Sequence, residues 1–132
     1  MPLTQEDQQK YKAFYLQTAR QLLIELQNNL TKLSSGNETE EVLEVLHRTF
    51  HSLKGQSEMM EYHAVGSLSR LLEFTFAAKR EGKLTLSKEI VKKVEEAVTE
   101  IEKCLAEIET NGKEKDLSTI TQELKGLVGD LG

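Results

Sequence analysis

A histidine, a lysine and a glycine stand close together in the stretch TFHSLKGQSEMMEY, which spans residues 49–62. A neutral imidazole such as that of His51 is a nucleophile near neutral pH, and a phosphoryl group on its ring would add about two negative charges. Lys54, one helical turn further on, would pair with that charge. Gly55 costs a helix interior about 1 kcal/mol relative to alanine, but it would let a second protein approach closely. The types and spacing of these residues therefore predict a nucleophilic histidine, a lysine that pairs with the charge of a bound phosphoryl group, and a glycine that leaves room for a second protein.

The helix that carries these residues is expected to expose them. Its apolar stripe consists of Val42, Val45, Leu46, Thr49 and Leu53. A helical wheel places His51 about 160° from the middle of this stripe. The residues on the same side as His51 are His47, Lys54, Gly55 and Glu58. A histidine in the core is therefore disfavoured, and the simplest alternative is a solvated polar face on which the histidine is incidental.

Helices are the elements that must position these residues. Apolar periodicity and short polar breaks predict helices over roughly 4–32, 37–60, 64–80, 86–110 and from 116 onward. Asn37 and Glu40 form a candidate capping box for the second helix. The expected stripe of the first helix is Tyr11, Tyr15, Ala19, Leu22, Leu26, Leu30 and Leu33. We therefore predict an all-α fold: an up-down-up-down four-helix bundle over residues 1–111, and a fifth helix with the start of a linker over 112–132.

Composition narrows the classes of function. The formal net charge is −5 with both signs interspersed, so no nucleic-acid surface is expected. No apolar run approaches the roughly 20 residues that cross a bilayer, so no membrane association is predicted. Cys104 is the single cysteine and falls within an apolar helical pattern, which favours a buried side chain and a cytoplasmic protein.

Metal and nucleotide sites are not expected in this chain. His47 and His51 are four residues apart, as two zinc ligands on one helix face can be, but the sequence offers no H-E-x-x-H and no well-placed further ligand. It also lacks a glycine-rich phosphate loop and a kinase nucleotide signature. We therefore expect no cofactor, and no catalysis by this chain alone.

Residues 51–55, H-S-L-K-G, resemble the H-x-x-K-G motif of histidine phosphotransfer (HPt) domains. In particular they are similar to the N-terminal phosphotransfer domain of chemotaxis-type histidine kinases, the CheA family. The resemblance runs without a gap through HSLKGQSEMMEYHAVGSLSRLLE at 51–73 and then AAKREGKL at 77–84. More loosely it covers the first and fifth helices.

The resemblance implies a phosphocarrier. His51 would accept a phosphoryl group at Nε2 from a histidine kinase catalytic domain and pass it to an aspartate of a response-regulator receiver domain. Glu73, in the L-L-E element, would hydrogen-bond the other ring nitrogen and orient the imidazole. Magnesium and ATP would be bound by the partner domains only. The chain would then be a module of a larger chemotaxis-type kinase.

Departures from the family pattern surround this motif. Many chemotaxis-type members have a second histidine where this chain has Arg70, and a glycine where Glu61 precedes an aromatic residue. Gln56 and Glu58 replace small residues after the K-G pair. The residues predicted to contact partners are His47, Gln56, Glu58 and Arg70. The departures leave open a second interpretation, a regulatory helical bundle that docks a partner without carrying phosphate.

Overall fold

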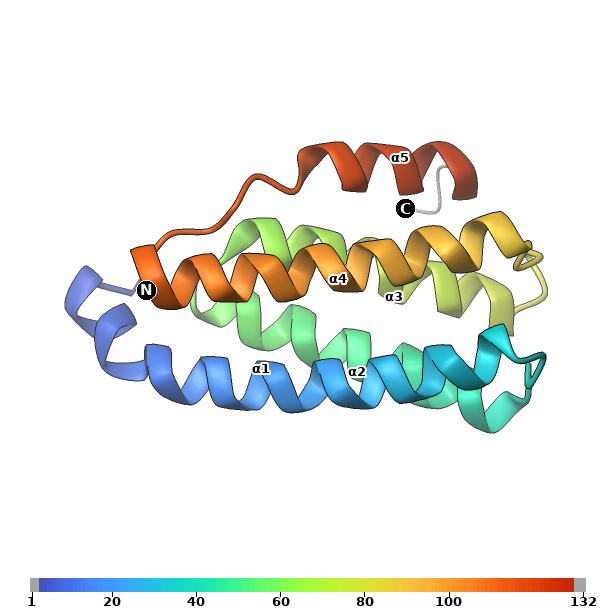
Figure 1. Cartoon of the computed structure of the whole chain (residues 1–132), viewed down its shortest axis with the longest axis horizontal. Coiled ribbons are helices and arrows are strands. Elements are labelled where there is room, and N and C mark those ends of the chain that lie inside the picture. Colours follow the sequence, from blue (N-terminus) through green and yellow to red (C-terminus); the bar gives the residue numbers. More distant parts are fainter. Residues whose placement is uncertain (1–2, 130–132) are drawn as a thin grey trace.

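An antiparallel bundle of helices forms the body of the molecule. The computed structural model describes residues 3–129. Its helices are α1 (Gln5–Ser34), α2 (Glu40–Met59), α3 (His63–Arg80), α4 (Lys88–Asn111) and α5 (Ser118–Val128). Figure 1 shows α1 to α4 alternating in direction, with α5 on the outside along α4. α5 also contacts α3. The predicted all-α bundle with an additional C-terminal helix is confirmed.

The core follows the apolar stripes, with two differences. In the segment 86–110 the apolar spacing predicts a buried stripe, and all of its residues are buried: Ile90, Val94, Val98 (or Ala97), Ile101, Leu105 and Ile108. Phe50, which lies outside the stripe expected for its helix, stacks on Phe76 of α3 with the ring centroids 5.8 Å apart, and both rings are fully buried. Tyr11, expected in the stripe of the first helix, is instead 47% exposed. Tyr11 lines an open groove together with Met59 and Met60 at the end of α2.

α2 begins later than the sequence predicts. Its N-cap is Thr39, whose hydroxyl accepts a hydrogen bond from the Val42 N–H at 3.2 Å. The expected capping box of Asn37 and Glu40 is therefore wrong. The Asn37 N–H donates to the Lys32 carbonyl at 3.0 Å, so this residue belongs to the turn that ends α1.

The turn between α2 and α3 keeps a backbone shape that favours glycine. Glu61, at the position where the family usually has glycine, has φ of +61°. The Tyr62 N–H donates to the Ser57 carbonyl and the Glu61 N–H to the Glu58 carbonyl, which is the Schellman pattern at a helix C-terminus. A side chain in this left-handed conformation costs about 1 kcal/mol. The Glu61 carboxylate accepts a hydrogen bond from the Leu3 N–H at 3.1 Å, which offsets part of this cost.

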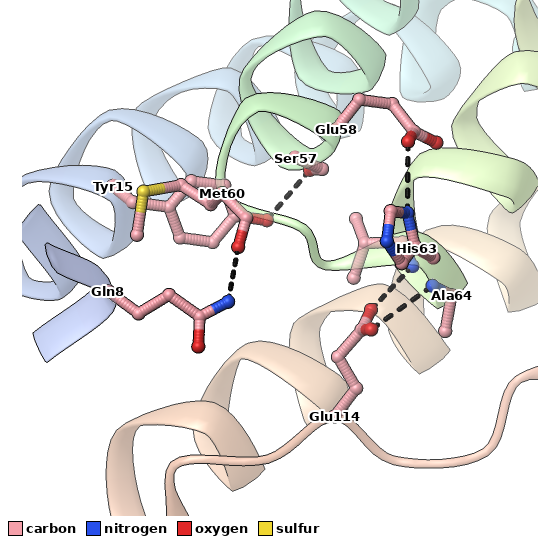
Figure 2. A network of polar contacts seen from close by, with 9 residues as sticks. Gln8, Tyr15, Ser57, Glu58, Met60, His63, Ala64 and Glu114 are labelled. Atoms are coloured by element: carbon pink, nitrogen blue, oxygen red, sulfur yellow. Dashed lines mark hydrogen bonds and ion pairs between the residues drawn. The ribbon is translucent and has the colours of Figure 1, made fainter. Parts of the chain in front are cut away.

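The N-terminus of α3 is capped by a distant residue. Figure 2 shows the carboxylate of Glu114, from the segment between α4 and α5, directed at the first turn of α3. It accepts hydrogen bonds from the backbone N–H groups of Ala64 at 3.1 Å and Val65 at 2.8 Å. The same end of the bundle is tied by a 2.7 Å hydrogen bond between the hydroxyls of Tyr15 and Ser57. The Glu114 bonds thus fix the start of α3, the helix that carries Glu73, to the segment that follows α4, and the Tyr15–Ser57 bond joins α1 to α2.

Cys104 is fully buried, as predicted, and burial raises the pKa of its thiol to about 11.

Between residues 3 and 129, no helix combines the length and the apolar character that a bilayer crossing requires.

Candidate functional site

The His51 ring lies on the surface of α2 and is anchored from α3. Its side chain is 63% exposed, as the helical wheel predicts. Nδ1 lies 2.6 Å from Oε2 of Glu73. A carboxylate can only accept, so Nδ1 carries the ring hydrogen and donates it. The lone pair of the neutral ring is therefore on Nε2, for which the described residues provide no hydrogen-bond partner.

Glu73 is a buried carboxylate, with a side chain only 10% exposed. Its second oxygen, Oε1, lies 3.0 Å from Nζ of Lys54. Burial alone would raise the pKa of Glu73, but the hydrogen bonds from Lys54 and His51, together with their charges, outweigh it and lower the pKa below its ordinary value. The carboxylate therefore stays ionised and is held from α2 at both oxygens.

A further imidazole faces the same carboxylate. Nε2 of His47, one turn before His51 on α2, lies 3.8 Å from Oε2 of Glu73. On its other side, Nδ1 of His47 is 2.9 Å from an amino group of Arg80. The Arg80 Nε donates to Glu40 at 2.9 Å. Sequence reasoning missed Arg80 and Glu40. The available signal was spacing, because Arg80 follows Glu73 by seven residues, two turns along the same face of α3.

Gly55 leaves open space next to the site, since a Cβ added there would meet no atom within 4 Å. Met59, four residues further on, is 75% exposed. His51, Gly55 and Met59 thus follow one another along one row of the α2 surface.

The remaining predicted contact residues have other partners. Gln56 accepts a hydrogen bond from the Thr18 hydroxyl of α1 at 3.0 Å. Glu58 pairs with His63 at 3.1 Å rather than with His51. The guanidinium of Arg70 lies over the Phe74 ring, 5.3 Å from its centroid. The structure therefore brings His47, Lys54 and Glu73 together with His51, and places the other three predicted contact residues outside this cluster.

An exposed imidazole held in one tautomer by a buried carboxylate is suited to accept and release an electrophile at Nε2. The hydrogen bond from Nδ1–H to Glu73 fixes the orientation of the ring. Lys54 holds the other oxygen of that carboxylate and brings a positive charge close to the ring. A helical bundle that presents such a histidine on its surface is typical of the class of histidine phosphotransfer domains.

Comparison with known proteins gives the family. The family model of the Hpt domain matches residues 10–110, and the chain belongs to this family. It is 24% identical over 122 residues to a chemotaxis protein CheA from Halobacterium salinarum, a match that covers 92% of this chain and 18% of that relative. The chain thus spans less than a fifth of the relative's length. No solved structure gives a significant match to this chain.

Proposed function

We propose that His51 is the phosphoacceptor of a phosphorelay, receiving its phosphoryl group from a histidine kinase catalytic domain and passing it to an aspartate of a response-regulator receiver domain. The observation that carries this proposal is the 2.6 Å contact between His51 Nδ1 and the buried Glu73, which leaves Nε2 as the reactive atom of an exposed ring. Similarity to a CheA protein supports a chemotaxis-type kinase as the source of phosphate, with this chain as one of its modules.

The ring can carry the phosphoryl group without moving a proton. The Nε2 lone pair attacks the terminal phosphorus of ATP on the kinase domain, and the bond from that phosphorus to the ADP oxygen breaks as the phosphorus–nitrogen bond forms. The ring then holds a positive charge, and its Nδ1–H remains bonded to Glu73. A carboxylate oxygen of the receiver aspartate later attacks the same phosphorus, and the neutral imidazole leaves. Magnesium and ATP are contributed by the partner domains, and phosphoryl transfer asks of this chain mainly position and charge.

The partner domains are expected to approach along the row from His51 past Gly55 to Met59. Gly55 leaves the space that a second backbone needs. Met59 and the neighbouring Phe14 of α1, which is 68% exposed, line an apolar groove at the end of this row. Exposed large apolar side chains gathered in one place are typical of protein interaction sites. Gln56 lies in the wall of the same groove.

The test is phosphoryl incorporation from labelled ATP with a chemotaxis-type kinase catalytic domain. The wild-type protein is expected to take up label that is stable in base and lost in acid, and to pass it to a receiver domain. His51→Gln should abolish uptake, whereas His63→Gln, which alters an exposed histidine away from the site, should retain it. Equal labelling of wild type and His51→Gln would overturn the proposal. Binding of the kinase domain with no label on His51 would instead favour the docking bundle.

A further inference from the structure

Arg80 determines which nitrogen of His47 carries the hydrogen. One of its terminal amino groups lies 2.9 Å from Nδ1 of His47. A guanidinium has only donors, so Nδ1 must accept, and the hydrogen of the neutral His47 ring is on Nε2. That atom faces Glu73 Oε2 at 3.8 Å, too far for a hydrogen bond but close enough for attraction between the N–H dipole and the carboxylate charge. His47 and His51 therefore present opposite ring nitrogens, each with a hydrogen, to one carboxylate oxygen.

Arg80 is itself held in place. Its Nε donates to Glu40 at 2.9 Å, and its side chain is largely buried for an arginine, at 30% exposure. Glu40 is the first residue of α2 and Arg80 the last of α3. The planar guanidinium thus spans the two helices and contacts both Glu40 and His47, a use for which its fixed donor geometry is suited.

The opposite tautomer of His47 would weaken this arrangement. A hydrogen on Nδ1 would point at the Arg80 donor, and the bare Nε2 would turn its lone pair toward the Glu73 oxygen. We infer that Arg80 is a positioning residue for phosphotransfer: through the tautomer of His47 it holds the Glu73 carboxylate where Oε2 accepts Nδ1–H of His51. This role rests on the proposed function of His51, but its structural half can be measured without any partner.

The first measurement is the tautomer of each ring in the isolated chain, read from long-range ¹H–¹⁵N spectra at a pH where both rings are neutral. Wild type should show the hydrogen on Nε2 in His47 and on Nδ1 in His51. Arg80→Met should convert His47 to a mixture and lower the Nδ1–H population of His51. Arg20→Met is the matched control, because it also removes an arginine paired with a glutamate, Glu109 at 3.1 Å, but on α1 away from the site.

The second measurement is the rate at which phosphoramidate, a small donor that needs no kinase, phosphorylates His51. Its phosphorus–nitrogen bond breaks and ammonia leaves as the bond to Nε2 forms. Arg80→Met should slow this reaction about threefold to tenfold, the factor that corresponds to the net value of one hydrogen bond. Arg20→Met should react at the wild-type rate. His47→Gln, which retains an N–H near the position of Nε2, should react faster than His47→Leu.

The outcomes separate the two proposals. A wild-type His47 with its hydrogen on Nδ1, or Arg80→Met with unchanged tautomers and rate, would overturn the role of Arg80 while leaving His51 as phosphoacceptor. A wild-type chain with the expected tautomers that takes no phosphate from either phosphoramidate or a kinase would overturn the proposed function and support only the control of the ring by Arg80.

Discussion

Within residues 3–129, two histidine–glutamate pairs join the same two atoms, Nδ1 and Oε2, in different settings. In one, Nδ1 of His51 meets Oε2 of Glu73 at 2.6 Å; in the other, Nδ1 of His63 meets Oε2 of Glu58 at 3.1 Å. Both histidines are exposed. Their partners differ, because the side chain of Glu73 is 10% exposed and that of Glu58 is 45% exposed.

The difference lies in what fixes the carboxylate. Glu73 comes from a neighbouring helix and is bound by Lys54 at its other oxygen, so it cannot turn away from His51. Glu58 and His63 are five residues apart, on the two sides of the turn that joins α2 to α3, and both side chains remain in solvent. An exposed ion pair is worth between nothing and about 1 kcal/mol and is screened by salt. A short distance between a histidine and a carboxylate therefore does not make a site; a carboxylate immobilised by burial and by a further partner does.

The strongest test of this comparison removes each carboxylate charge in turn. Glu73→Gln should slow phosphorylation of His51 about tenfold to a hundredfold, by analogy with the loss that follows when the carboxylate that orients a metal-binding histidine is changed. Glu58→Gln should leave the rate unchanged. Initial rates of label incorporation measure both effects. Similar losses in the two variants would show that the buried pair has no special role.

The next largest effect is expected for the cation that holds the buried carboxylate. Lys54→Met should slow phosphorylation about fivefold, because a charge interaction of about 1 kcal/mol corresponds to that factor. Lys79→Met is a close match, since Lys79 is similarly exposed, at 26% against 27%, and also pairs with a glutamate, Glu38. Phosphoramidate labelling of both proteins gives the comparison. A loss in Lys79→Met as large as that in Lys54→Met would count against a specific role for Lys54.

A smaller effect concerns stability at acid pH. Because the pKa of Glu73 is lowered in the folded state, the unfolded chain takes up this proton at a higher pH than the folded chain does. The stabilising contribution of its charge is complete above the ordinary carboxyl pKa and is lost as the pH falls through the lowered folded value. The free energy of unfolding of wild type, relative to that of Glu73→Gln, should therefore decrease from pH 6 to pH 3. Urea unfolding at a series of pH values measures it, and a constant difference would be inconsistent with the lowered pKa.

The smallest effect is expected for a change at Glu61, which lies in the turn between Glu58 and His63. Glu61→Gly relieves the left-handed strain in the turn before His63, at the loss of the hydrogen bond to Leu3. The free energy of unfolding should rise by about 0.5 kcal/mol or more, with the rate of His51 phosphorylation unchanged. Thermal unfolding and labelling test the two halves. A changed labelling rate would mean that this end of α2 contributes to the chemistry after all.

The features that could be predicted from the sequence are those that depend on the residue pattern within a single helix. The wheel placed His51 on the exposed face, and periodicity gave the bundle, because both follow from the 3.6-residue repeat alone. The contact between His47 and Arg80 depends on how far α3 slides along α2, which no pattern within one helix records. Asn37 is at least as good an N-cap by type as Thr39, but it is already bonded to the turn that ends α1, which the sequence of α2 does not show. Tyr11 fits the stripe of its helix but lies in an open groove beside the end of α2, and a pattern within one helix does not show where its neighbour ends.

The carboxylate of Glu114 has a practical consequence for shortening the protein. The match to the family model ends at residue 110, four positions before the group that caps α3. A fragment cut after Asn111 would leave the N–H groups of Ala64 and Val65 without that acceptor, at a cost of about 1 kcal/mol. It would also uncover the surface of α3 and α4 on which α5 packs. A fragment that keeps both the Glu114 cap and the cover over α3 and α4 therefore extends through α5 to Val128.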